Sequence, residues 1–142
     1  MAMTRKELDQ IINDHFMFEA TDNIDGVLGS LAEAVEHEVV PSPMGTSRDK
    51  GQIRSYYELL FTHVSGESVA PARRYYGDDF VIDETMWHGR IEDGQPFLCE
   101  GKSGPVSFKL LHVFEVRGGK ITREQAWCNL AAIQRQLDCK LS

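Results

Sequence analysis

The sequence lacks the features that mark membrane, secreted and nucleic-acid-binding proteins. It has no apolar run long enough to cross a membrane, and its first segment, MAMTRKELDQ, lacks the apolar stretch of a secretory signal. Lys and Arg number 15 against 22 Asp and Glu, which gives a net charge of −7. A negative field disfavours nucleic acids and anionic membranes as partners. We therefore expect a cytoplasmic protein that binds neither of them.

Cysteines and short chemical motifs are also scarce. The three cysteines, Cys99, Cys128 and Cys139, are odd in number and have no paired spacing, which predicts reduced thiols. The chain has no C-x-x-C, no H-E-x-x-H, no glycine-rich phosphate loop and no G-x-S-x-G. None of its five histidines forms a local pair with metal-ligand spacing, although three could converge in the fold. We expect neither a metal nor another cofactor.

The 142 residues suit one domain, 1–142, whose first half is helical in pattern. Thr4 and Glu7 form a capping box, and the apolar residues that follow recur at helical spacing, which places His15 on the apolar face. Asp22 can cap a second, short helix. A third helix is expected over 47–64, capped by Ser47 or Asp49.

The second half alternates with the period of strands. One strand is expected earlier, at 33–40 between the second and third helices, and 72–91 reads as one long strand with a bulge near 77–79. Glu84 and His88 would share a face of that strand. Gly118 and Gly119 predict a two-residue hairpin turn, and a last short helix is expected near 131–137. Helices followed by strands favour an α+β fold, with one antiparallel sheet wrapped against the helices.

The segment LLHVFEVRGGKITREQAW, 110–127, places His112 inside an apolar run. If Arg117 pairs with Lys120 across the glycine turn, simple counting gives three further pairs: His112 with Gln125, Leu110 with Trp127, and Phe108 with Asn129. These six side chains would share one face, since side chains alternate along a strand. Large apolar groups with a few polar ones are typical of a ligand pocket. A hydrogen-bonded core histidine is the alternative for His112.

The stretch HVFEVRGGKITREQAW leading into LAAIQRQL, together with VIDETMWHG, resembles the SnoaL-like branch of the nuclear transport factor 2-like superfamily. The resemblance covers about residues 5–138. It implies a cone-shaped fold with a deep apolar pocket and a homodimer through the outer sheet face. That face would carry Leu111, Val113, Glu115, Glu124 and Ala126. The superfamily includes polyketide cyclases, ketosteroid isomerases, epoxide hydrolases, dehydratases and members without chemistry.

The resemblance also implies site residues. His15 falls where ketosteroid isomerases have the tyrosine of their oxyanion hole, His112 falls near the aspartic acid of that hole, and Tyr57 matches a supporting tyrosine. The isomerase base precedes a proline, and here Val40 stands at that position. Asn129 stands at the pocket aspartate of limonene epoxide hydrolases, whose other two catalytic residues have no match.

These observations support a hypothesis of cofactor-free acid/base catalysis. The substrate would be a small hydrophobic carbonyl compound, and the reaction an isomerisation, cyclisation or dehydration. The expected catalytic residues are His112, His15 and Glu84, the last being the best remaining carboxylate. The expected pocket residues are Tyr57, His88, Phe108, Leu110, Gln125, Trp127 and Asn129. The alternative function is non-catalytic binding of an apolar ligand.

Overall fold

The computed structural model describes residues 2–42 and 44–139, which form helices and one six-stranded sheet. In chain order the elements are α1 (Arg5–Ala20), α2 (Ile24–Ser30), β1 (Leu31–Val40), β2 (Thr46–Ser47), α3 (Lys50–His63), β3 (Val64–Tyr76), β4 (Phe80–Ile91), the 3-10 helix η1 (Gln95–Phe97), β5 (Gly104–Arg117), β6 (Lys120–Cys128) and α4 (Leu130–Gln136). None of the described helices is both long and apolar enough to span a membrane.

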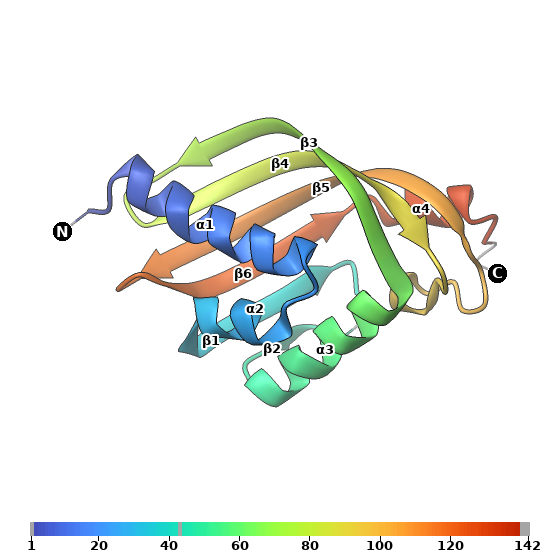
Figure 1. Ribbon diagram of the computed structural model, residues 1–142, viewed down its shortest axis with the longest axis horizontal. Helices are drawn as coiled ribbons and strands as arrows, with labels where there is room; N and C mark the ends of the chain where they lie inside the picture. Colours follow the sequence, from blue (N-terminus) through green and yellow to red (C-terminus); the bar gives the residue numbers. More distant parts are fainter. Residues whose placement is uncertain (1, 43, 140–142) are drawn as a thin grey trace.

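The sheet has the strand order β2-β1-β6-β5-β4-β3 and is strongly curved, with α1 lying across one face of it (Figure 1). The predicted α+β class is confirmed. The expectation of a purely antiparallel sheet is wrong, because β1 pairs with β6 in parallel. A parallel pair needs a long crossover. Here the crossover includes every element from β2 to β5.

The helix starts follow from capping residues. The capping box is confirmed, since the Glu7 amide donates to Thr4 Oγ1 (3.1 Å) and the Thr4 amide donates to Glu7 Oε1 (3.2 Å). Asp49, one of the two expected caps of α3, accepts two amide protons at its start. The expected cap of α2 is wrong. Asn23 caps this helix, and Asp22 has a φ of 54°, which places it in the preceding turn.

The predicted long strand over 72–91 is wrong, because it is the hairpin of β3 and β4. The residues read as a bulge, 77–79, form the turn between the two strands. The Gly77 amide donates to the Phe80 carbonyl over 2.8 Å and closes this turn. Glu84 and His88 nevertheless share a face, as expected, since β4 pairs with β5 without a register shift.

The hairpin of β5 and β6 begins as predicted, with Arg117 opposite Lys120. Its register then shifts, because Glu115 pairs with Arg123 and Thr122 is the additional residue of a bulge. The Thr122 hydroxyl donates to the Glu115 carbonyl over 3.1 Å and holds the bulge in place.

The shift reverses the faces of the rest of β6. His112 lies opposite Ala126, not opposite Gln125 as the simple count predicted. Gln125 and Trp127 therefore point to the convex face of the sheet, and Glu124 points to the concave face with His112. A one-residue slip has this effect because side chains alternate along a strand.

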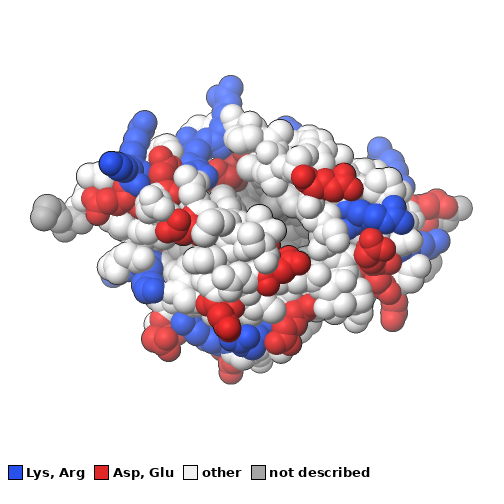
Figure 2. All heavy atoms as spheres, in the orientation of Figure 1, with Lys and Arg blue, Asp and Glu red and all other residues white. Residues whose placement is uncertain are grey.

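The concave face carries two apolar clusters. One joins α1, α2 and α3 to the sheet around Ile12, Tyr57 and Phe114. The other joins α4 and η1 to the far ends of β4 and β5 around Phe97 and Phe108. Figure 2 shows that the molecule is hollowed between the C-terminal end of α1 and β3.

Candidate functional site

Glu124 is the centre of a buried polar cluster on the concave face. Its side chain is 1 % exposed. Oε2 lies 3.1 Å from Nε2 of His15 and 3.8 Å from Nε2 of His112. Oε1 accepts a hydrogen bond from the Tyr57 hydroxyl (3.1 Å) and lies 3.8 Å from Nε2 of His37. Three imidazoles and a phenol, from four different elements, thus face one carboxylate.

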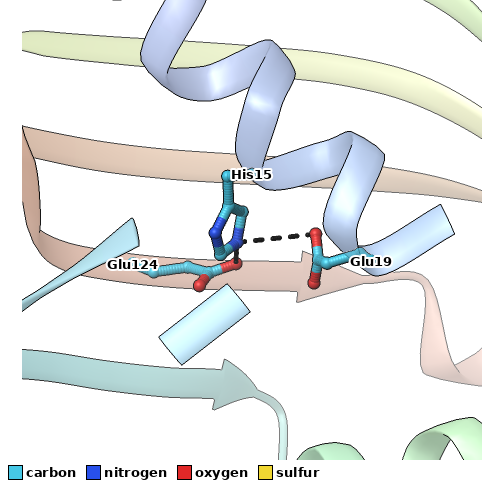
Figure 3. Close-up of side chains that lie close together, drawn as sticks. All are labelled: His15, Glu19 and Glu124. Carbon is cyan, nitrogen blue, oxygen red and sulfur yellow. Dashed lines mark hydrogen bonds and ion pairs between the residues drawn. The ribbon is translucent and has the colours of Figure 1, made fainter. Parts of the chain in front are cut away.

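His15 comes from α1 and is fully buried. Its Nδ1 lies 2.7 Å from Ser30 Oγ, and the Ser30 hydroxyl proton is donated to the Val27 carbonyl. Ser30 can therefore only accept from His15, so Nδ1 carries a proton. Nε2 points at the carboxylates of Glu124 and Glu19, at 3.1 Å and 3.5 Å (Figure 3).

If His15 were neutral, with its proton on Nδ1, the lone pair of Nε2 would face two carboxylates. The charged ring instead donates a proton from each nitrogen. Burial opposes the charge, but the Glu124 and Glu19 carboxylates outweigh it and raise the pKa of His15 to about 9. Burial likewise disfavours the Glu124 carboxylate. The positive charge of His15 outweighs this and lowers the pKa of Glu124 to about 2. At neutral pH these two groups form a buried ion pair.

Glu19 lies at the edge of the cluster. Burial, reinforced by the neighbouring Glu124 charge, raises its pKa to about 7, against the opposing effect of His15. His15, Glu19 and Glu124 each offer one ligand atom within 4.8 Å of the others, a spacing at which they could hold a metal ion. The proton on His15 Nε2 satisfies the same oxygens, so a metal is not required to explain the arrangement.

His37 and Tyr57 support Glu124 from β1 and α3. Because the Tyr57 hydroxyl donates to Glu124, it accepts from Nε2 of His37, which lies 3.3 Å away. Burial raises the pKa of Tyr57 well above its usual value, so the phenol stays a neutral donor. Burial also lowers the pKa of His37.

His112 differs from His15 although both face the same carboxylate. Its ring stacks on Phe114, with centroids 5.3 Å apart, and meets the edge of Phe16 at 5.0 Å. Burial lowers its pKa to about 4, against the attraction of Glu124. The cluster therefore places a charged donor, His15, beside a neutral acceptor, His112.

A second polar group lies next to His112. Asp83 on β4 pairs directly with His112 across the strands. Its Oδ2 accepts from Nε of Arg74 over 2.7 Å. Nη1 of Arg74 also donates to Asp9 over 2.8 Å, and the Tyr76 hydroxyl donates to the same Asp9 oxygen.

The structure brings together three of the residues expected from the sequence, namely His15, His112 and Tyr57. Phe108 shares the concave face of β5 with His112, as expected, and belongs to the second apolar cluster. Leu110 lies between them in sequence and is partly buried against that cluster.

The other five expected site residues lie neither in the Glu124 cluster nor in the second apolar cluster. Asp83 lies on the concave face, so Glu84 and His88 lie on the convex face, because side chains alternate along a strand. There Glu84 Oε1 is 3.5 Å from Lys109 Nζ, and His88 Nδ1 is 2.7 Å from Ser107 Oγ. Trp127 is 45 % exposed and donates to Gln125 on the same face. Asn129 accepts from the Ala132 amide and is the N-cap of α4.

The convex face has a shallow depression of about 220 Å³. It is lined by Glu84, Lys109, Leu110, Leu111, Trp127, Cys128 and Asn129. Several residues expected in an internal pocket therefore line this outer surface. The Glu124 cluster is the stronger candidate for a reactive site, because it gathers three imidazoles and a carboxylate away from solvent.

Sequence reasoning missed Glu124, His37 and Asp83. A signal existed for His37, since it alternates with Val35 and Val39 on what must be the buried face of β1. Asp83 was missed because its neighbour Glu84 was taken as the catalytic carboxylate of that strand. Glu124 was assigned to the wrong face because the count assumed a regular hairpin without the bulge at Thr122.

The family model of the SnoaL-like domain matches residues 12–124. Among solved structures, a protein from Shewanella putrefaciens described as a SnoaL-like polyketide cyclase has a TM-score of 0.78 and 12% identity, with 96% of this chain and 98% of that chain covered. A protein with a ketosteroid isomerase-like fold from Catenulispora acidiphila, in complex with trimethylamine, has a TM-score of 0.74 and 17% identity, covering 92% and 93%. An epoxide hydrolase from M. tuberculosis has a TM-score of 0.71 and 19% identity, covering 93% and 90%. No curated protein matches the chain.

Proposed function

Because this chain belongs to the SnoaL-like domain family, we propose that it binds a small molecule on its concave face and catalyses a proton transfer there without a cofactor. The observation that carries the proposal is the pair of histidines around Glu124. Burial lowers the pKa of one to about 4, and carboxylates raise the pKa of the other to about 9. Two titratable groups whose pKa values are driven apart are the usual arrangement of an acid and a base in one site.

The substrate is a small hydrophobic carbonyl compound that enters the hollow in Figure 2. The apolar clusters on either side of the polar groups favour such a ligand. His112 takes a proton from the carbon next to the carbonyl, and the electron pair of the broken C–H bond moves onto the carbonyl oxygen. His15 and Tyr57 stabilise this enolate when its oxygen replaces Glu124 as the acceptor of one of their protons. The proton returns at another carbon in an isomerisation, or leaves with a hydroxyl group in a dehydration.

The test follows the histidines by NMR while apolar ketones and phenols are added. A ligand of the proposed site shifts the signals of His15 and His112 and leaves His88, on the convex face, unchanged. A bound ketone then exchanges its α-hydrogen with solvent deuterium. We expect His112→Gln to abolish this exchange and the control His88→Gln to retain it.

Non-catalytic binding is the second candidate function. It is favoured by the hydrogen bonds of Glu124, which are already satisfied by His15 and Tyr57 in the unliganded protein. Ligand-induced shifts without any exchange of the α-hydrogen would identify this function. If no compound shifts an internal histidine, both functions are wrong.

We also propose that the protein forms a homodimer through the convex face of the sheet. Leu111 and Val113 lie on this face beside the exposed Trp127. The predicted interface is corrected in one respect, because Glu124 and Ala126 belong to the concave face. Cytoplasmic localisation and the absence of nucleic-acid and membrane partners stay predictions.

A further inference from the structure

Two buried polar atoms of the described residues have no hydrogen-bond partner, and they belong to neighbouring side chains. They are Oδ1 of Asp83 and Nδ1 of His112. The two residues are directly opposite each other on β4 and β5, so both side chains rise side by side from the concave face. Since buried polar atoms are nearly always hydrogen-bonded, two such exceptions at adjacent positions require one explanation.

The other acceptors around His112 already have donors. Glu124 accepts from His15 at Oε2 and from Tyr57 at Oε1. Asp83 accepts from Arg74 at Oδ2 only. Oδ1 of Asp83 is therefore the buried carboxylate oxygen next to His112 that still needs a proton donor.

We propose that Asp83 is a positioning residue that accepts the Nδ1 proton of His112, so that Nε2 is the atom that exchanges a proton with the substrate. The assignment of Nε2 to the reaction rests on the proposed function. The contact itself does not. It calls for a rotation of the Asp83 carboxylate, whose last side-chain torsion is broad, toward the directly opposite His112.

The surroundings of His112 explain why such positioning would matter. The titratable groups that face it are Asp83 from β4, Glu124 from β6, His15 from α1 and His37 from β1. Protonation of Nε2 during the reaction would create an imidazolium between the two carboxylates, Asp83 at Nδ1 and Glu124 at 3.8 Å from Nε2. Both anions stabilise the charged ring that exists only after proton transfer, while burial keeps the resting ring neutral.

The test reads the position of the proton on His112 by ¹⁵N NMR of the full chain with labelled histidine and no ligand. Protonated and unprotonated ring nitrogens have well-separated ¹⁵N shifts. At neutral pH we expect Nδ1 to be protonated and Nε2 unprotonated. In Asp83→Asn the new amide can donate to Nδ1, so the proton is expected to move to Nε2. The matched control is Asp9→Asn, which removes the other carboxylate partner of Arg74 and should leave His112 unchanged.

A proton on Nε2 in the wild type overturns the inference, and so does an unchanged His112 in Asp83→Asn. The wild-type spectrum decides the matter even if that variant does not fold. A change of equal size in Asp9→Asn also overturns it, because Asp83 would then act only through Arg74. These readings need no substrate. If the proton lies on Nε2, the role of Asp83 is wrong and the proposed function is unaffected. If no ligand shifts an internal histidine, the proposed function is wrong and the role of Asp83 is unaffected.

Discussion

The substitution Glu124→Gln tests the buried ion pair most directly. Glutamine keeps the shape of the side chain and removes the charge. Its single carbonyl oxygen can accept from His15 or from Tyr57, because the amide nitrogen replaces the other oxygen of Glu124. Of the two carboxylates that raise the pKa of His15, only Glu19 then remains, 3.5 Å from Nε2. We therefore expect the pKa of His15 to fall and the folded state to lose the stabilisation that its charge provides.

The magnitude follows from the change in the pKa of His15 on folding. The pKa rises from 6.5 to about 9, which corresponds to about 3 kcal/mol of folding free energy. Between these values the folded protein holds a proton that the unfolded chain has lost. The stabilisation is therefore full below pH 6.5, declines as the pH rises, and is gone above about pH 9.

The acidic limit comes from Glu124, whose pKa falls from 4.5 to about 2 on folding. Its stabilisation is present above pH 4.5 and is lost as the pH falls through 2. Both values describe one ion pair, so their energies are not added. The pair stabilises the fold fully between pH 4.5 and 6.5.

The assay is urea unfolding of the wild type and the variant at about pH 6 and about pH 9.5. We expect Glu124→Gln to lose about 2–3 kcal/mol at the lower pH and less than about 1 kcal/mol at the higher one. The control Glu84→Gln changes a carboxylate on the convex face and should cost no more than about 0.5 kcal/mol at either pH. Equal losses at both pH values, or a wild-type His15 that titrates near 6.5, would refute the ion pair.

Substitutions at three further positions test other parts of the structure. Phe114→Ala should cost about 3–5 kcal/mol in urea unfolding, because the fully buried ring stacks on His112 and leaves a cavity. Asn129→Ala should cost about 1 kcal/mol through loss of the α4 cap, whereas Asn129→Asp should keep both the cap and the ligand response. Trp127→Ala should shift the protein toward monomer in size-exclusion chromatography with light scattering and leave its unfolding free energy within about 0.5 kcal/mol. A wild type that is already monomeric would contradict the proposed interface.

Local signals in the sequence predicted most helix starts and one of the two long hairpins. The Thr4–Glu7 capping box indicates a helix start, and the glycine pair at 118–119 indicates a tight turn. Each signal depends on only a few neighbouring residues, so both could be recognised without knowledge of the fold. The β3–β4 hairpin was missed because its turn, 77–79, also fits a bulge. Both interpretations place small and acidic residues between apolar ones.

The site depended on one residue that local signals did not resolve. The simple count through the glycine turn would have placed Arg123 opposite Phe114, inside the core. The bulge at Thr122 instead turns Arg123 outward to Glu115, 3.4 Å away, and brings Glu124 inward. The conflict between a buried arginine and a regular strand was therefore the available sign of the bulge.

The energetics of the cluster favour the proposed proton transfer. Apolar clusters flank Glu124 on the concave face, so apolar side chains in place of the polar ones would form one continuous core. Apolar residues of similar volume often replace a buried ion pair without loss of stability. This chain instead places Glu124 among three imidazoles, with a second buried carboxylate, Asp83, opposite His112. Packing does not require such an arrangement, whereas the proposed site uses it, with His15 as the proton donor and the neutral ring of His112 as the acceptor.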